Sequence, residues 1–85
     1  MRRQYERITK ARRRILEFIA RNPGVTATDV AQSLARNKWE EVRVFARTKW
    51  LLEHGYIYVK RDWDKRRRPL ALTAKGWRAL GCEPL

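Results

Sequence analysis

The spacing of apolar residues changes at Gly55, and this change constrains the fold more than any other feature of the chain. Before Gly55, apolar side chains recur every three or four residues, which is the period of an amphipathic helix. After Gly55, residues 56–61 alternate between two faces, which is the period of a β-strand. The sequence therefore predicts an α+β domain in which helices come first and strands follow.

Turn-forming residues divide the part before Gly55 into three helices. The first is expected from about Tyr5 to Arg21, and the sequence Asn22-Pro23-Gly24 ends it. Its apolar side consists of Tyr5, Ile8, Ile15, Leu16 and Ile19. The second is expected from about Ala27 to Ala35, because Thr26 can cap it and Asp29 places a negative charge in its first turn.

A third helix is expected from Asn37 to about His54. Asn37 and Glu40 have the spacing of a capping box, and Gly55 can take the left-handed conformation that ends a helix. At 100° per residue this helix has two apolar faces. One face carries Val44, Thr48, Leu51 and Leu52, with Phe45 at its margin, and we expect it to pack inward. The opposite face carries Trp39, Val42, Ala46 and Trp50.

The segment 56–72 is expected to form a β-hairpin with a long basic loop. Ile57 and Val59 should face the core, while Tyr56, Tyr58 and Lys60 should point the other way. Thr73 then caps a short last helix that ends at Gly81. With only 85 residues, the whole chain is predicted to be one domain, with a core between about residues 5 and 80.

The net charge of the chain indicates which class of partner it is expected to bind. Lys and Arg number 21 and Asp and Glu number 9, which gives a formal charge of +12. A polyanion would relieve this self-repulsion, so nucleic acid is the first expectation. A membrane surface is disfavoured, because the apolar side of the first helix is expected in the core.

The sequence gives no support for catalysis. An enzyme with separate cofactor and substrate lobes would not fit in 85 residues. The single Cys82 and the single His54 cannot supply four metal ligands, and no small-molecule ligand is evident. We therefore expect a non-enzyme without cofactor or metal. The absence of a secretory signal or an apolar membrane span further predicts a cytoplasmic protein.

Four phrases resemble winged helix-turn-helix proteins, especially regulators of the multiple-antibiotic-resistance type and small archaeal DNA-binding proteins. They are "GVTATDVAQSL", "WLLEHGYI", "RDWDKRRRPLALT" and "LTAKG", and the match covers roughly residues 10 to 80. The resemblance implies a helix-turn-helix over about 27–54 and a wing over about 56–72. The long flanking helices that such regulators use to dimerise are missing or short, so both a monomer and a homodimer are compatible with the sequence.

What the resemblance implies for function is a transcriptional regulator that binds double-stranded DNA, with helix 38–54 in the major groove. On this helix we expect contacts from Lys38, Trp39, Arg43, Ala46, Arg47, Lys49 and Trp50. Arg43 is the first candidate for a base contact, because its planar fork can donate two hydrogen bonds to guanine, whereas Lys49 suits a phosphate. Trp39 and Trp50 have alternative roles as protein contacts, and Trp50 also as part of the core.

The wing would contact the DNA backbone or the minor groove. From Lys60 to Arg68 there are six basic and two acidic residues, a net charge of +4. The candidate contacts are Lys60, Arg61, Trp63, Lys65, Arg66, Arg67 and Arg68, where Trp63 either enters the minor groove or folds back on the hairpin. Further candidate phosphate contacts are Thr28, Arg36, Arg12 and Arg13.

A second function of a different class stays open. Winged helices also serve as modules that bind nucleic acid without sequence specificity, or bind proteins, within larger replication or transcription assemblies. The tryptophans of the third helix suit either aromatic stacking or a partner surface.

Overall fold

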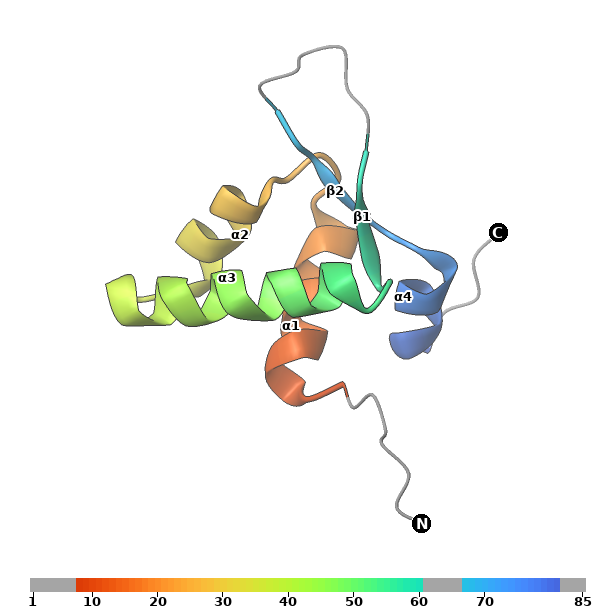
Figure 1. Cartoon of the computed structure of the whole chain (residues 1–85), viewed down its shortest axis with the longest axis horizontal. Coiled ribbons are helices and arrows are strands. Elements are labelled where there is room, and N and C mark those ends of the chain that lie inside the picture. The colour runs from red at the N-terminus through yellow and green to blue at the C-terminus, as the bar shows by residue number, and fades with distance from the viewer. Residues whose placement is uncertain (1–7, 61–66, 82–85) are drawn as a thin grey trace.

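The computed structural model describes residues 8–60 and 67–81, and it confirms an α+β winged helix-turn-helix fold. The elements are α1 (Lys10–Arg21), α2 (Ala27–Leu34), α3 (Lys38–Glu53), β1 (Ile57–Val59), β2 (Leu70–Leu72) and α4 (Ala74–Ala79). Figure 1 shows α3 crossing in front of α1, with α2 beside its N-terminal half and the β-hairpin rising next to its C-terminal end. The two strands are antiparallel, with Tyr58 opposite Ala71.

Side chains cap the helices where the sequence predicted caps. Thr26 and Asp29 form a reciprocal capping box, with N···O distances of 3.2 and 3.0 Å. Asn37 Oδ1 accepts a hydrogen bond from the Glu40 N–H at 3.0 Å. The Glu40 carboxylate accepts its own bond from the N–H of Arg36 rather than from that of Asn37, so this second box is only half formed. These local bonds fix where α2 and α3 begin.

The first helix begins later than predicted. We expected it from about Tyr5, but Ile8 and Thr9 lie outside the helix and α1 starts at Lys10. The reason is that Thr9 has an extended backbone and its hydroxyl accepts a bond from the Arg12 N–H at 3.3 Å, which makes it the N-cap. Tyr5 lies outside the described residues.

One face of α3 belongs to the core, as predicted. Val44, Thr48 and Leu51 are buried there, and the Thr48 hydroxyl donates to the Val44 carbonyl at 2.8 Å, which satisfies the one buried polar side chain in the described core. The remaining core residues are Ile15, Leu16, Ile19, Val30, Ala31, Tyr56, Ile57, Leu70 and Leu72. Leu52 was wrongly assigned to this face. It is 40% exposed, because it lies roughly 80° around the helix from Val44.

The strand prediction was wrong at both ends of the first strand. Tyr56 is buried although it was expected to face away from the core, and Val59 is exposed although it was expected to face inward. Tyr56 precedes the strand and donates its N–H to the Leu51 carbonyl at 2.9 Å, so it belongs to the turn after α3. Val59 is the last residue of a strand of three residues, at the end of the hairpin that projects away from the helices (Figure 1).

Hydrogen bonds fasten the hairpin to the helices at both of its ends. The N–H of Leu70 donates to the Val25 carbonyl at 2.7 Å, between α1 and α2. The Tyr56 carbonyl accepts a bond from the Thr73 N–H at 3.1 Å, and Thr73 in turn caps α4 through the N–H of Gly76. These bonds therefore tie the two described strands of the hairpin to the helical core.

We predict that Gly76→Ala destabilises the protein. Helix propensity alone would make this change stabilising by up to about 1 kcal/mol. However, a Cβ at Gly76 would overlap the Tyr56 carbonyl oxygen, and such overpacking costs about 1–3 kcal/mol. Urea unfolding measures the free energy, with Ala74→Ser at the exposed start of the same helix as the control. A gain in stability for Gly76→Ala would contradict the close approach of α4 to Tyr56.

Candidate nucleic-acid interface

The outer face of α3 is left uncovered by the rest of the described chain from Trp39 to Ala46. Trp39 is 81% exposed and Val42 is 64% exposed, and Ala46 lies on the same side of the helix. The exposed bases Lys38, Arg43 and Lys49 border this strip. The structure thus brings five of the seven predicted residues of this helix to one accessible surface, and adds Val42, which lies on the same face but was not among the predicted contacts. Its β-branched apolar side chain at a position opposite the core was the available signal.

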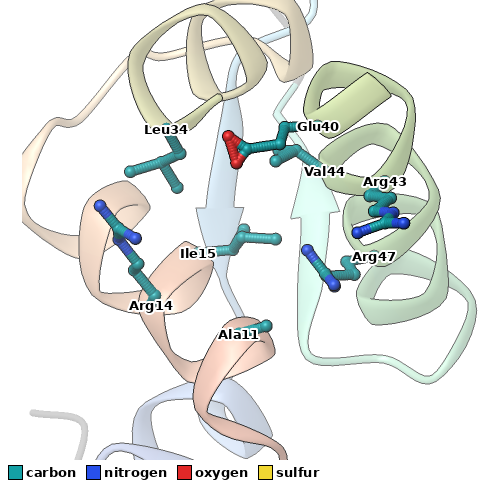
Figure 2. Close-up of a pocket in the computed structure, with 8 residues that line it drawn as sticks. All are labelled: Ala11, Arg14, Ile15, Leu34, Glu40, Arg43, Val44 and Arg47. Carbon is teal, nitrogen blue, oxygen red and sulfur yellow. The ribbon is translucent and has the colours of Figure 1, made fainter. Parts of the chain in front are cut away.

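Arg47 faces the first helix rather than the outer surface. It lines a hollow of about 190 Å³ together with Arg14 and Arg43. Figure 2 shows these side chains reaching the hollow from α1 and α3, with the Glu40 carboxylate between α2 and α3 and the side chains of Ile15, Val44 and Leu34 around it. Arg43 therefore lies between the outer strip, formed by Trp39, Val42 and Ala46, and the hollow that Arg14 and Arg47 also line.

Trp50 lies within a stack of side chains, which bears on the alternative roles that the sequence left open for it. Its ring stacks on His54 with the centroids 3.9 Å apart, and on Tyr56 at 5.8 Å. The guanidinium of Arg12 lies 3.6 Å from the Trp50 ring centroid. These contacts favour the interpretation in which the half-buried Trp50 packs against the core. They also engage Arg12, a candidate phosphate contact, in a cation–π interaction.

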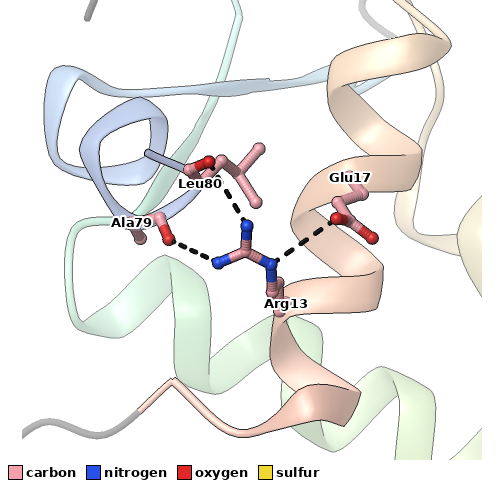
Figure 3. Close-up of polar contacts among 4 residues, drawn as sticks. All are labelled: Arg13, Glu17, Ala79 and Leu80. Atoms are coloured by element: carbon pink, nitrogen blue, oxygen red, sulfur yellow. Dashed lines mark hydrogen bonds and ion pairs between the residues drawn. The ribbon is translucent and has the colours of Figure 1, made fainter. Parts of the chain in front are cut away.

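Arg13 was also a candidate phosphate contact, and the structure gives it internal partners instead. Its guanidinium donates to the carbonyls of Ala79 and Leu80 at 3.0 and 3.3 Å, and it lies 3.5 Å from Glu17 (Figure 3). The last carbonyls of a helix lack partners within the helix, and a cation there also matches the helix dipole. Arg13 therefore ties the C-terminal end of α4 to α1.

The remaining predicted contacts lie at the ends of other elements. Thr28 is exposed in the first turn of α2, and Arg36 is exposed just before α3. On the hairpin, Lys60, Arg67 and Arg68 are exposed, and Arg67 donates to the Gly24 carbonyl at 3.0 Å. The other wing residues named from the sequence lie outside the described residues, namely Arg61, Trp63, Lys65 and Arg66.

The described residues form neither a metal-binding cluster nor a membrane-spanning helix. No group of three His, Cys, Asp or Glu side chains within residues 8–60 and 67–81 is placed to hold a metal ion. His54 lies at the C-terminal end of α3, where its Nδ1 is 2.9 Å from the Trp50 carbonyl. In the same part of the chain, no helix has the length and apolar character to cross a membrane.

We predict that Arg13→Ala lowers the free energy of unfolding by about 1 kcal/mol, because a hydrogen bond from a charged group is worth about 1.5–3 kcal/mol and solvent exposure reduces this value. Arg14→Ala removes the same charge one residue later, from a side chain with no hydrogen bond to a described residue, and should change stability by less than about 0.5 kcal/mol. Thermal or urea unfolding measures both variants. Equal losses would show that Arg13 does not hold α4.

Comparison with known proteins supports the fold. No protein-family model matches the chain, and no curated protein matches it. Among solved structures, the chain is similar to the crystal structure of a mutant of MepR from a multidrug-resistant S. aureus clinical isolate, with a TM-score of 0.69 and 25% identity. The match covers 86% of this chain and 52% of the MepR chain, so this chain spans about half the length of that regulator.

MepR is a winged-helix regulator of the MarR family, a family of non-enzymes. The likeness extends over the helices, the antiparallel hairpin and the C-terminal helix. The chain thus has a winged helix-turn-helix fold that resembles regulators of the multiple-antibiotic-resistance type, as its sequence predicted.

Proposed function

We propose that this chain is a cytoplasmic transcriptional regulator that binds double-stranded DNA as a single winged-helix domain. In this proposal α3 enters the major groove, while the basic residues of the wing contact the backbone or the minor groove. The observation that carries it is the division of α3 into two faces. One face is buried in the core at Val44, Thr48 and Leu51, and the other is open in the N-terminal half of the helix at Trp39 and Val42.

Charge supports a nucleic acid as the partner. The chain carries +12 in 85 residues, and Arg43 and Lys49 on α3 form no hydrogen bond with another described residue. A duplex offers regularly spaced phosphates that bind such cations with release of counterions. Arg43 is suited to guanine O6 and N7 through its two-pronged donor geometry, and Lys49 to a phosphate.

The alternative function is a protein-binding or nonspecific nucleic-acid-binding module of a larger assembly. The observation that favours it is the exposure of large apolar side chains on α3, with Trp39 81%, Val42 64% and Phe45 40% exposed. Exposed apolar patches often mark protein contacts. Under this alternative, Trp39→Ala would abolish binding to a protein partner and leave duplex affinity intact.

Selection from a randomised duplex pool tests the proposal directly, with sequencing at two salt concentrations and single-stranded DNA as competitor. We expect an enriched motif that survives the higher salt. A palindromic motif with half-sites about one helical turn apart would indicate a homodimer, and one short site a monomer. Binding that loses all preference at higher salt, or that favours the single strand, would support the alternative.

We predict different effects for the two bases that border the outer strip. Arg43→Ala should relax the preference at one or two base pairs of the selected motif, since a bidentate contact contributes about 1–3 kcal/mol of discrimination. Lys49→Ala should weaken all duplexes about equally and reduce the salt slope by about 1. Affinities measured for the motif and for its single-base variants across a salt series separate these effects. If Arg43→Ala weakens every sequence equally, this residue does not contact a base.

A further inference from the structure

We infer that α3 recognises thymine through its 5-methyl groups, using the apolar strip formed by Trp39, Val42 and Ala46. This inference rests on the proposed function and names the kind of DNA site that the same helix would select. The three residues follow one another at spacings of three and four, so they lie along one side of α3. Trp39 and Val42 lie in the N-terminal half of the helix, which is the part that reaches base edges in helix-turn-helix proteins, and Ala46 follows directly after it.

Exposure sets this strip apart from the rest of the described surface. Trp39 and Val42 are the two most exposed large hydrophobic residues of the described chain. Nothing else in the described chain covers them, although the same helix buries Leu51 completely. Their apolar surface would be removed from water only by a partner. Ala46 continues the strip with a side chain small enough to let the helix backbone come close to that partner.

The chemistry of the strip determines what it can distinguish in the major groove. Val42 and Ala46 carry no donor or acceptor, so they cannot discriminate bases by hydrogen bonds. The thymine methyl group is the apolar feature that separates base pairs on this side of the duplex, and small apolar side chains contact it. A strip of this composition therefore favours sites rich in thymine, while Arg43 at its border remains available for a guanine.

The bases that border the strip argue for DNA as its occupant. Arg43 borders one side of the strip, and Lys38 and Lys49 border the other. A second copy of the chain would bring another +12 against these bases, and the two copies would repel each other. The groove of a duplex offers apolar methyl groups between two rows of phosphates, which matches an apolar strip with cations on both sides.

The test compares duplexes of alternating sequence, about two helical turns long, that differ only in methyl groups. Replacing thymine by deoxyuridine in d(AT) removes each methyl, and replacing cytosine by 5-methylcytosine in d(GC) adds one. We expect the full chain to bind d(AT) more tightly than d(AU), by about fourfold for each methyl that it contacts. Methylation of d(GC) should tighten binding in the same direction.

Two variants test whether a difference in affinity between d(AT) and d(AU) depends on the strip. Val42→Ser should reduce the d(AT) to d(AU) ratio by about fourfold, because it removes the apolar contact and leaves the backbone and the charge unchanged. Leu52→Ser is the matched control, since Leu52 is a 40% exposed aliphatic residue of the same helix outside the strip, and it should keep the wild-type ratio. Circular dichroism confirms that both variants are folded.

The outcomes separate this inference from the proposal on which it rests. Equal affinity of the wild-type chain for d(AT) and d(AU), with tight binding to both, would overturn methyl recognition and leave the DNA-binding proposal in place. A ratio that Val42→Ser and Leu52→Ser change equally would also overturn the role of the strip. Failure to bind any duplex, with the strip instead required for an acidic protein partner, would overturn both.

Discussion

The packing of α3 across α1 and α2 determines which side chains of α3 face solvent and are available to a partner. Leu51 and Leu16 are completely buried where these helices meet, and Val30 fills the space from α2. Burying each side chain of this kind contributes roughly 1.5–3 kcal/mol, so the rotation of α3 about its axis is strongly fixed. Once that rotation is fixed, Trp39 and Val42 must point to solvent.

The positive charge of the chain divides into structural and accessible groups. Arg12 and Arg13 are neighbours on α1, and each finds a partner inside the fold, one on the Trp50 ring and the other at the carbonyls that end α4. Arg43 and Lys49 on α3 form no such bonds with described residues. A count of basic residues therefore overstates the surface available to DNA, because arginine also serves as a hydrogen-bond donor for helix ends and as a cover for aromatic rings.

The combination of apolar and basic residues on α3 connects the two proposals. Phosphate contacts by lysine and arginine provide affinity and depend on salt, whereas contacts with base edges provide discrimination. In this chain the bases border the outer strip and the apolar residues form it, so discrimination would rely on methyl groups and on Arg43. The hollow lined by Arg14, Arg43 and Arg47 places further positive charge beside the strip.

Much of the local structure was determined by the sequence alone. The caps at Thr26, Asn37 and Thr73 and the buried face of α3 were predictable, because each depends on residues a few positions apart. The internal role of Arg13 was not, and the sequence left open whether Trp50 packs in the core or contacts a partner. Arg13 bonds to a carbonyl 66 residues away, and Trp50 stacks under Arg12 from another helix. Only the tertiary structure decides such contacts, because local spacing shows which side of a helix a residue occupies but not which distant segment covers that side.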